Sequence, residues 1–302
     1  MSGPTESQSR VLVALHRMSR TLTELSNDAA AQQAATGKRP ERSWYEYFHH
    51  YAIDREALTE AAHAAAIPKT WTDHVRGRGV RGLAWVPGKR LPAPEPIDWD
   101  RVLGDLDTDI RRLQELAGLA ADYQVHPSAG SARLSTAVDI HLRIMRARTT
   151  GIANVLGLTS DQGHEIWGAD QDWIHVAASH VADLTVIDRD ARARELVRVD
   201  TTTYTTQNNT LHGAGISLTR TPALPDLDTL IPAITAALAP ARRATTVTDL
   251  DIRTSSTAIE IATDLHTSRG EVLDVTGEPD RWESGSEQAS GPTGPAGNGA
   301  ER

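Results

Sequence analysis

The chain has 302 residues, of which 39% are hydrophobic and 24% charged, a composition typical of a globular protein with one large core or about two domains. Cysteine is absent, which excludes disulfides, catalytic thiolates and cysteine-ligated zinc. No run approaches the roughly 18 apolar residues of a membrane helix, and the N-terminus lacks the features of a signal peptide, so we expect a cytoplasmic protein without a membrane partner. The formal charge of −9 disfavours binding of a polyanion over the whole surface.

A long helix is expected near the N-terminus, because apolar residues recur there every three or four positions. This stripe comprises Val11, Leu15, Met18, Leu22, Leu25 and Ala29. Thr5 and Gln8 have the spacing of a capping box at the start of the helix. Such a stripe packs within one chain or pairs with a second chain in a short coiled coil. Its length of three heptads favours packing within the chain.

Five of the 13 aromatic residues fall within "SWYEYFHHYAIDRE", residues 43–56. If this stretch were one helix, Arg55 would lie in the middle of its aromatic face and Ile53 would point the opposite way. We therefore predict two helices, with Asp54 as the N-cap of the second. The aromatic helix, residues 44–51, is expected to pack in the core and to support the basic helices that follow.

Residues 54–82 have the outline of a helix-turn-helix unit. One helix runs to Ala66, and Pro68 opens a second helix that is expected to end at Gly77. Ala66 stands where a turn glycine is usual. The distribution of charge along the chain also favours a basic surface in this part. Residues 1–91 hold 13 basic and 9 acidic side chains, a formal charge of +4, whereas residues 92–302 hold 18 and 31, a formal charge of −13.

The segment 68–90 of this unit is the predicted nucleic-acid interface, since basic side chains bind phosphates and aromatic rings stack on bases. The predicted phosphate-binding residues are Lys69, Arg76, Arg78, Arg81, Lys89 and Arg90, and the predicted stacking residues are Trp71 and Trp85. In the alternative interpretation, Gly77 caps a helix and the arginines belong to a solvated loop.

Four prolines in residues 86–97 predict a linker, since such a run cannot continue a helix. It separates an N-terminal helical module, residues 1–85, from a long-helix bundle, residues 98–220. Residues 128–221 contain no proline, which favours successive helices. Two helices of the bundle repeat the apolar stripe, at Leu103, Leu106, Ile110, Leu113, Ala117 and Ala120, and at Val138, Leu142, Met145, Thr149, Ile152 and Leu156.

A second helix-turn-helix pattern occupies residues 151–168, with Ser160 as the expected N-cap. Residues 149–188 contain no Lys or Arg and include six carboxylates, so we do not expect this segment to contact phosphates. His164, His175 and His180 lie in the same region, but their spacing matches no metal-binding motif, and surface histidines are the default interpretation.

The C-terminal third has weaker patterns. Residues 196–206 are compatible with a helix or a strand, and we favour a helix. Residues 221–283 are expected to form a small mixed α/β or helical region, in which 255–266 fits either period. Residues 284–302 hold five glycines and no large apolar residue, which predicts a disordered tail.

The sequence therefore predicts a mainly α fold, a multi-helix bundle with a helix-turn-helix-like module. Phosphate loops, dinucleotide fingerprints and nucleophile elbows are missing, so we predict no cofactor and name no catalytic residue. The preferred function is non-enzymatic binding or regulation, with DNA or RNA contacting residues 68–90. The alternatives are a protein-interaction or assembly protein that self-associates through its helical stripes, and a metal-dependent enzyme using His and carboxylate residues at 161–188.

Overall fold

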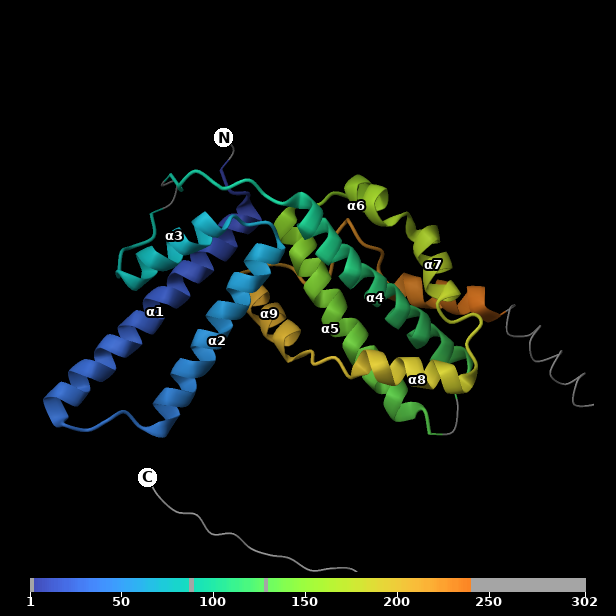
Figure 1. Cartoon of the computed structure of the whole chain (residues 1–302), viewed down its shortest axis with the longest axis horizontal. Helices are drawn as coiled ribbons and strands as arrows, with labels where there is room; N and C mark the ends of the chain where they lie inside the picture. Colours follow the sequence, from blue (N-terminus) through green and yellow to red (C-terminus); the bar gives the residue numbers. More distant parts are fainter. Residues whose placement is uncertain (1–2, 87–89, 128–129, 240–302) are drawn as a thin grey trace, which may run out of the picture. The chain divides into compact units, whose positions relative to one another are not determined.

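Figure 1 shows the computed structural model of the chain, which describes residues 3–86, 90–127 and 130–239. All of these residues belong to one compact unit, Met1–Thr248. Within the described ranges the regular structure is helical, and no strand occurs there. The predicted mainly α, multi-helix fold is confirmed.

The helices alternate with short turns and loops along the described chain. In order they are α1 (Glu6–Thr36), α2 (Arg42–Ala64), α3 (Lys69–Val80), α4 (Trp99–Val125), α5 (Ala132–Leu156), α6 (Ser160–Trp167), α7 (Asp170–Ser179), α8 (Val186–Val197) and α9 (Thr202–Gly213). Residues 227–239 are also helical.

The core is built on α4 and α5, which lie side by side, with α1 and α2 contributing from one end of each helix (Figure 1). The predicted stripes supply this core. Residues at most 6% exposed include Val11, Leu15 and Leu22 of α1, Leu106, Ile110 and Leu113 of α4, and Val138, Leu142 and Ile152 of α5. These residues thus pack within one chain and are not available to a second copy, whereas Leu25 and Ala29, at the end of the first stripe, are not buried.

Helix α1 begins with the predicted capping box. The Gln8 amide donates to Thr5 Oγ1 at 3.2 Å, and the Thr5 amide donates to Gln8 Oε1 at 3.0 Å. The helix ends at Gly37, whose φ of 70° is left-handed. This end lies far beyond Ala29, because the residues after the apolar stripe are mostly alanine and glutamine, which favour a helix without needing a core.

Helix α2 is continuous from Arg42 to Ala64, so the predicted break before Asp54 is wrong. The prediction assumed that the aromatic face is buried. Instead Ile53 is 43% exposed, and the Arg55 side chain, 24% exposed, lies beside Glu56 at the edge of the core. Because this stretch of α2 is largely solvated, the positions of Ile53 and Arg55 are compatible with one continuous helix.

The turn between α2 and α3 is a Schellman motif built on alanine. Ala66 has a left-handed φ of 55°, the Ile67 amide donates to Ala62 O at 2.9 Å, and the Ala66 amide donates to His63 O at 3.1 Å. These bonds satisfy the last carbonyl groups of α2, and α3 begins shortly afterwards, at Lys69. The position at which a turn glycine was expected is therefore the left-handed position of the turn.

Helix α3 continues through Gly77 to Val80, so the predicted end at Gly77 is wrong. It packs chiefly along α1 and touches α2 little. A Cβ on Gly79 would lie 2.5 Å from His16 O, so the glycine allows the α3 backbone to approach α1. The close approach explains why a glycine-rich segment is helical here.

The proline-rich segment is attached to α3 by hydrogen bonds. Trp71 Nε1 donates to Pro92 O at 2.9 Å, and the Glu95 carboxylate accepts from the amides of Lys69 and Thr70 at the start of α3. Hydrogen bonds from Thr70 and Lys69 lower the pKa of Glu95 to about 2. The carboxylate therefore acts as an N-terminal cap supplied by another segment.

The later helices agree with the sequence except at their ends. Thr159, rather than Ser160, is the N-cap of α6, and its side chain forms a capping box with Gln162. Residues 196–206 contain the end of α8, a turn and the start of α9, and no strand. The predicted features at 255–266 and 284–302, and all of 240–283, lie outside the described residues.

Candidate binding surface

The cations predicted to bind phosphate have several partners within the chain. Lys69 Nζ pairs with Asp73, Arg76 Nη2 lies 3.4 Å from Glu56 Oε2, and Arg78 Nη2 donates to Ala84 O at 2.9 Å. Arg81 and Arg90 are exposed, and Lys89 lies outside the described residues. Among the described residues of the predicted interface, the cations most open to solvent are Arg81, Arg90 and Lys69, the last of which is paired with Asp73.

The two predicted stacking residues face the protein. Trp71 is 6% exposed and belongs to the core. Trp85 is half-buried, and its ring lies edge-on to the ring of His16 at a centroid distance of 5.6 Å. Trp71 therefore presents no open face of the kind that a base stacks on, and Trp85 is partly covered.

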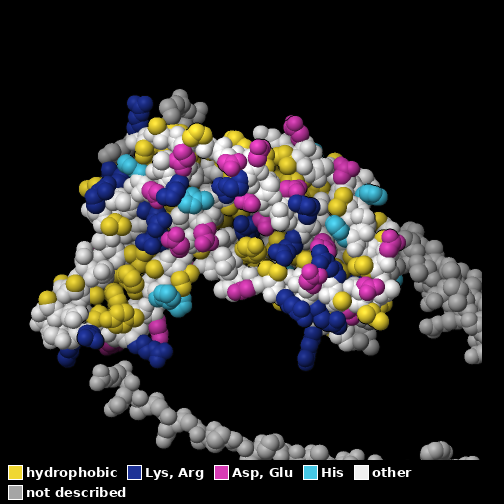
Figure 2. Space-filling model, viewed as in Figure 1, with side chains coloured by type: hydrophobic (Ala, Val, Ile, Leu, Met, Phe, Trp, Pro, Cys, Tyr) yellow, Lys and Arg dark blue, Asp and Glu magenta, His cyan; other side chains and the backbone are white. Residues whose placement is uncertain are grey.

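Charges of both signs surround this region. On the face seen in Figure 2, dark blue and magenta side chains are interspersed over α3 and its neighbours. Many of these pairs lie one turn apart on the same helix, such as Arg20 with Glu24 at 2.7 Å and Arg101 with Asp105 at 3.4 Å. Lys and Arg side chains therefore form no continuous patch on this face.

The histidines of the acidic region do not assemble a metal site. Within the described ranges, no three His, Cys, Asp or Glu side chains are grouped as metal ligands would be, and this includes His164, His175 and His180. The corner between α5 and α6 has a packing role instead, because a Cβ on Gly163 would lie 2.2 Å from Ala223 O.

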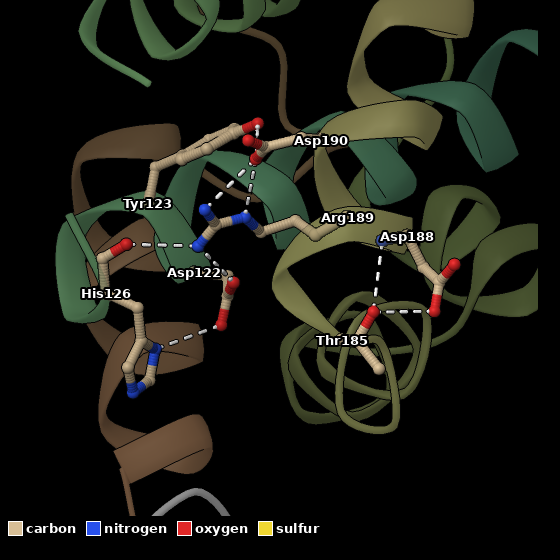
Figure 3. A network of polar contacts seen from close by, with 7 residues as sticks. All are labelled: Asp122, Tyr123, His126, Thr185, Asp188, Arg189 and Asp190. Carbon is tan, nitrogen blue, oxygen red and sulfur yellow. Dashed lines mark hydrogen bonds and ion pairs between the residues drawn. The ribbon is translucent and has the colours of Figure 1, made fainter. Parts of the chain in front are cut away.

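A buried polar network joins α4 to α8 (Figure 3). Arg189, 1% exposed, donates to Asp122 Oδ2 at 3.2 Å, to His126 O at 3.0 Å and to Asp190 Oδ1 at 3.1 Å, and its guanidinium lies 4.3 Å from the centre of the Tyr123 ring. Burial and the hydrogen bond to Asp190 raise the pKa of Tyr123. These groups satisfy one another, which indicates a structural role.

Surface hollows offer a further kind of site. One of about 240 Å³ lies between the start of α4 and the α5–α6 corner, lined mainly by apolar side chains that include Trp99, Leu103 and Ile166. Convergent polar groups, which fix the orientation of most small ligands, are few there. This hollow does not define a catalytic site.

The most unusual feature of the described chain is the outer part of the α1–α2 hairpin, residues 23–54, which we call the distal hairpin. Leu22 is the last buried residue of α1, and Ala57 is the first buried residue of α2. None of the residues from 23 through 56 is buried. This part of the two long helices therefore extends beyond the core.

The aromatic residues of the chain are concentrated on this hairpin. Tyr45 and Tyr47 are 51% and 54% exposed, whereas Trp44, Phe48 and Tyr51 are half-buried. Figure 2 shows a group of yellow side chains between α1 and α2 at this end of the hairpin. The aromatic helix that was expected to pack in the core instead presents much of its aromatic surface to solvent.

The aromatic rings are ordered by contacts with one another. Trp44 stacks on Phe48 with centroids 5.1 Å apart and meets Tyr45 edge-on at 5.0 Å, and Tyr47 stacks on Tyr51 at 6.0 Å. Ring pairs at these distances favour one arrangement of the side chains. A surface arranged in advance loses less side-chain entropy when a partner binds.

The charges on the distal hairpin are mixed and nearly balanced. Its three basic residues, Lys38, Arg39 and Arg42, face five acidic ones, Glu24, Asp28, Glu41, Glu46 and Asp54, so its formal charge is 3 − 5 = −2. Arg42 pairs with Glu46 at 2.8 Å. Such a surface does not attract a polyanion.

Comparison with protein-family models, with curated proteins and with solved structures finds no match to this chain. Among the described residues, no helix has the length and apolar character needed to cross a bilayer. The surface of the molecule is therefore the basis for assigning a function. The signal that the sequence reasoning missed is the composition of the opposing half of α1, "TELSNDAAAQQAAT", which is too small and polar to bury five aromatic rings.

Proposed function

We propose that this protein is a non-enzymatic helical binding protein and that its distal hairpin binds another protein. The observation that carries the proposal is the absence of any buried residue from 23 through 56, in a stretch that holds five of the 13 aromatic residues. Exposed aromatic surface rimmed by polar residues is characteristic of protein interfaces.

The chemistry of the surface favours a protein over a nucleic acid. Tyrosine and tryptophan dominate the energetics of protein contacts because they combine a large apolar area with a polar group. Tyr45 and Tyr47 fit this role. Nucleic-acid affinity depends largely on uncompensated cations, whereas the formal charge of this hairpin is −2.

A site-specific crosslink tests the proposal. Because the chain has no cysteine, Tyr47→Cys can carry a photoactivatable crosslinker without background labelling. The matched control is Ile187→Cys on α8, at a residue that is 79% exposed. In cells that express the protein, we expect a discrete protein adduct from position 47, competed by unlabelled wild-type chain. Equal labelling from both positions, or none from position 47, would contradict the proposal.

Nucleic-acid binding through residues 68–90 is the second candidate, since Arg81 and Arg90 are exposed near the end of α3 and in the segment that follows it. The same experiment with Arg81→Cys distinguishes the two. An adduct from position 81 that nuclease removes would support the second candidate, whereas a nuclease-resistant adduct from position 47 supports the first.

A further inference from the structure

Residues 217–224, which we call the strap, lie between α9 and the helix at 227–239 (Figure 1). The strap contains neither helix nor strand, and within the described chain no backbone-to-backbone hydrogen bond involves any of its residues. We propose that the strap is a conformational device that opens as a local unit while the helical bundle stays folded. This proposal goes beyond the proposed function and does not depend on it.

Side-chain hydrogen bonds from α5 hold the two ends of the strap. At its start, Asn154 Nδ2 donates to Ser217 O at 2.8 Å and to Arg220 O at 2.9 Å. At its end, Arg146 Nη2 donates to Leu224 O at 3.4 Å. Because positions 146 and 154 are two turns apart on α5, the strap runs along the helix between them.

The middle of the strap covers a buried hydroxyl. Thr150 lies one turn from Arg146 and one turn from Asn154, so it shares their side of α5. Thr150 is fully buried, and its Oγ1 atom has no hydrogen-bond partner within the described residues. A buried hydroxyl in this state costs free energy that contact with water would recover.

Arg146 adds a buried charge beneath the strap. The residue is 7% exposed, its Nη1 atom has no hydrogen-bond partner in the described part of the chain, and its bond to Leu224 O is long. Burial lowers the pKa of Arg146 to about 10, and the charge of Asp226 offsets this effect only in part. The guanidinium therefore stays charged at neutral pH, and the closed strap keeps it from water without full compensation.

The strap is thus held by opposing contributions. Hydration of Arg146 and Thr150 favours the open state, whereas the hydrogen bonds of Asn154 and the burial of Ala223 and Leu224, which are 3% and 6% exposed, favour the closed state. Since no backbone hydrogen bond joins the strap to a helix, opening it requires no helix to unfold.

Cysteine labelling tests the proposal, because the chain has no cysteine of its own. Ala223→Cys places a thiol on the strap, and Ala117→Cys places one at a fully buried residue of α4. Without urea, we expect a thiol reagent to modify position 223 at least about tenfold faster than position 117. Below the onset of unfolding, the rate at position 223 should be insensitive to urea, whereas the rate at position 117 should rise with it.

Substitutions beneath the strap test its cause in the Ala223→Cys background. Arg146→Met keeps most of the side-chain length and removes the charge, so it should slow labelling by about tenfold. Asn154→Asp removes the Nδ2 donor at nearly constant size, so it should accelerate labelling by about tenfold. Asn209→Asp, at an exposed residue of α9, is the matched control and should have no effect.

Three outcomes would overturn the proposal. Equal rates at positions 223 and 117, with the same dependence on urea, would show that the strap opens only when the bundle unfolds. An unchanged or faster rate in Arg146→Met would show that the buried charge does not favour opening. Equal changes at both positions in Asn154→Asp would assign its effect to global stability. Melting temperatures verify folding, and Thr221→Cys, at a strap residue that is 8% exposed, replaces Ala223→Cys if that variant does not fold.

Discussion

Arg189 holds a full positive charge in the interior, where its side chain is 1% exposed. Asp122, also 1% exposed, and Asp190 supply the opposite charge, and the Tyr123 ring covers the guanidinium (Figure 3). Asp122 precedes Arg189 by 67 residues in the sequence. Neither residue type nor local spacing indicates such a pair, so the network could not be predicted from the sequence.

Replacing Arg189 tests how much this network contributes to stability. Arg189→Leu leaves the buried Asp122 carboxylate without its guanidinium partner, so we expect a loss of about 3–5 kcal/mol in the free energy of unfolding. Arg192→Leu on the same helix is the control. Its side chain is 41% exposed and pairs with Glu115 and Glu195, so we expect a loss of under about 1 kcal/mol. Urea unfolding at neutral pH measures both, and equal losses would show that burial of the pair does not matter.

At the scale of helices, α3 illustrates what local sequence signals miss. Glycine usually ends a helix, and on that basis Gly77 was expected to end α3. The helix continues because its backbone packs against α1, a contact that Gly79 permits and that the sequence of α3 alone does not reveal. We therefore expect the two glycines of this helix to have opposite effects on its stability.

Alanine substitutions separate the two glycines. A Cβ at Gly79 would lie 2.5 Å from His16 O and 2.9 Å from Ser19 Cβ, so Gly79→Ala should lower the free energy of unfolding by about 1–3 kcal/mol. A Cβ at Gly77 meets only the end of the Arg81 side chain, at 3.6 Å, so Gly77→Ala should raise stability by about 0.5–1 kcal/mol. Thermal unfolding measures both changes. If both variants were stabilised, α3 could not pack on α1 as described.

Helix existence was easier to predict than helix ends. Apolar periodicity predicted the long helices because it reports which residues face a core, and Leu15, Ile110 and Ile152 do so. The predicted break in α2 is wrong because the apolar residues of that stretch do not face a core. Large apolar residues within 43–56 were expected to be core residues, but their burial depends on packing partners that the local pattern does not specify.

For the whole molecule, the sequence identified the region of interest but not its role. The aromatic segment was expected to support a basic site some twenty residues downstream. In the structure Trp71 of that site is in the core, and Tyr45 and Tyr47 of the support are exposed. An aromatic cluster has the same composition whether it is core or interface, so only its burial distinguishes the two.

Helix α2 begins in solvent and ends in the core. The central claim can therefore be tested within this one helix. Tyr47 and Leu58 are eleven residues apart, since 58 − 47 = 11, and this spacing places them on one face of the helix. Leu58 is fully buried, whereas Tyr47 is 54% exposed. If the distal hairpin is a binding surface, truncating these two residues must have different consequences.

The most direct measurement is therefore thermal and urea unfolding of Tyr47→Ala beside Leu58→Ala, together with the crosslinking behaviour of Tyr47→Ala. We expect Leu58→Ala to lose about 2–5 kcal/mol of unfolding free energy. We expect Tyr47→Ala to change it by less than about 0.5 kcal/mol while it loses partner binding. A loss of stability in Tyr47→Ala comparable to that of Leu58→Ala would show that the aromatic residues belong to the core, and would contradict the account.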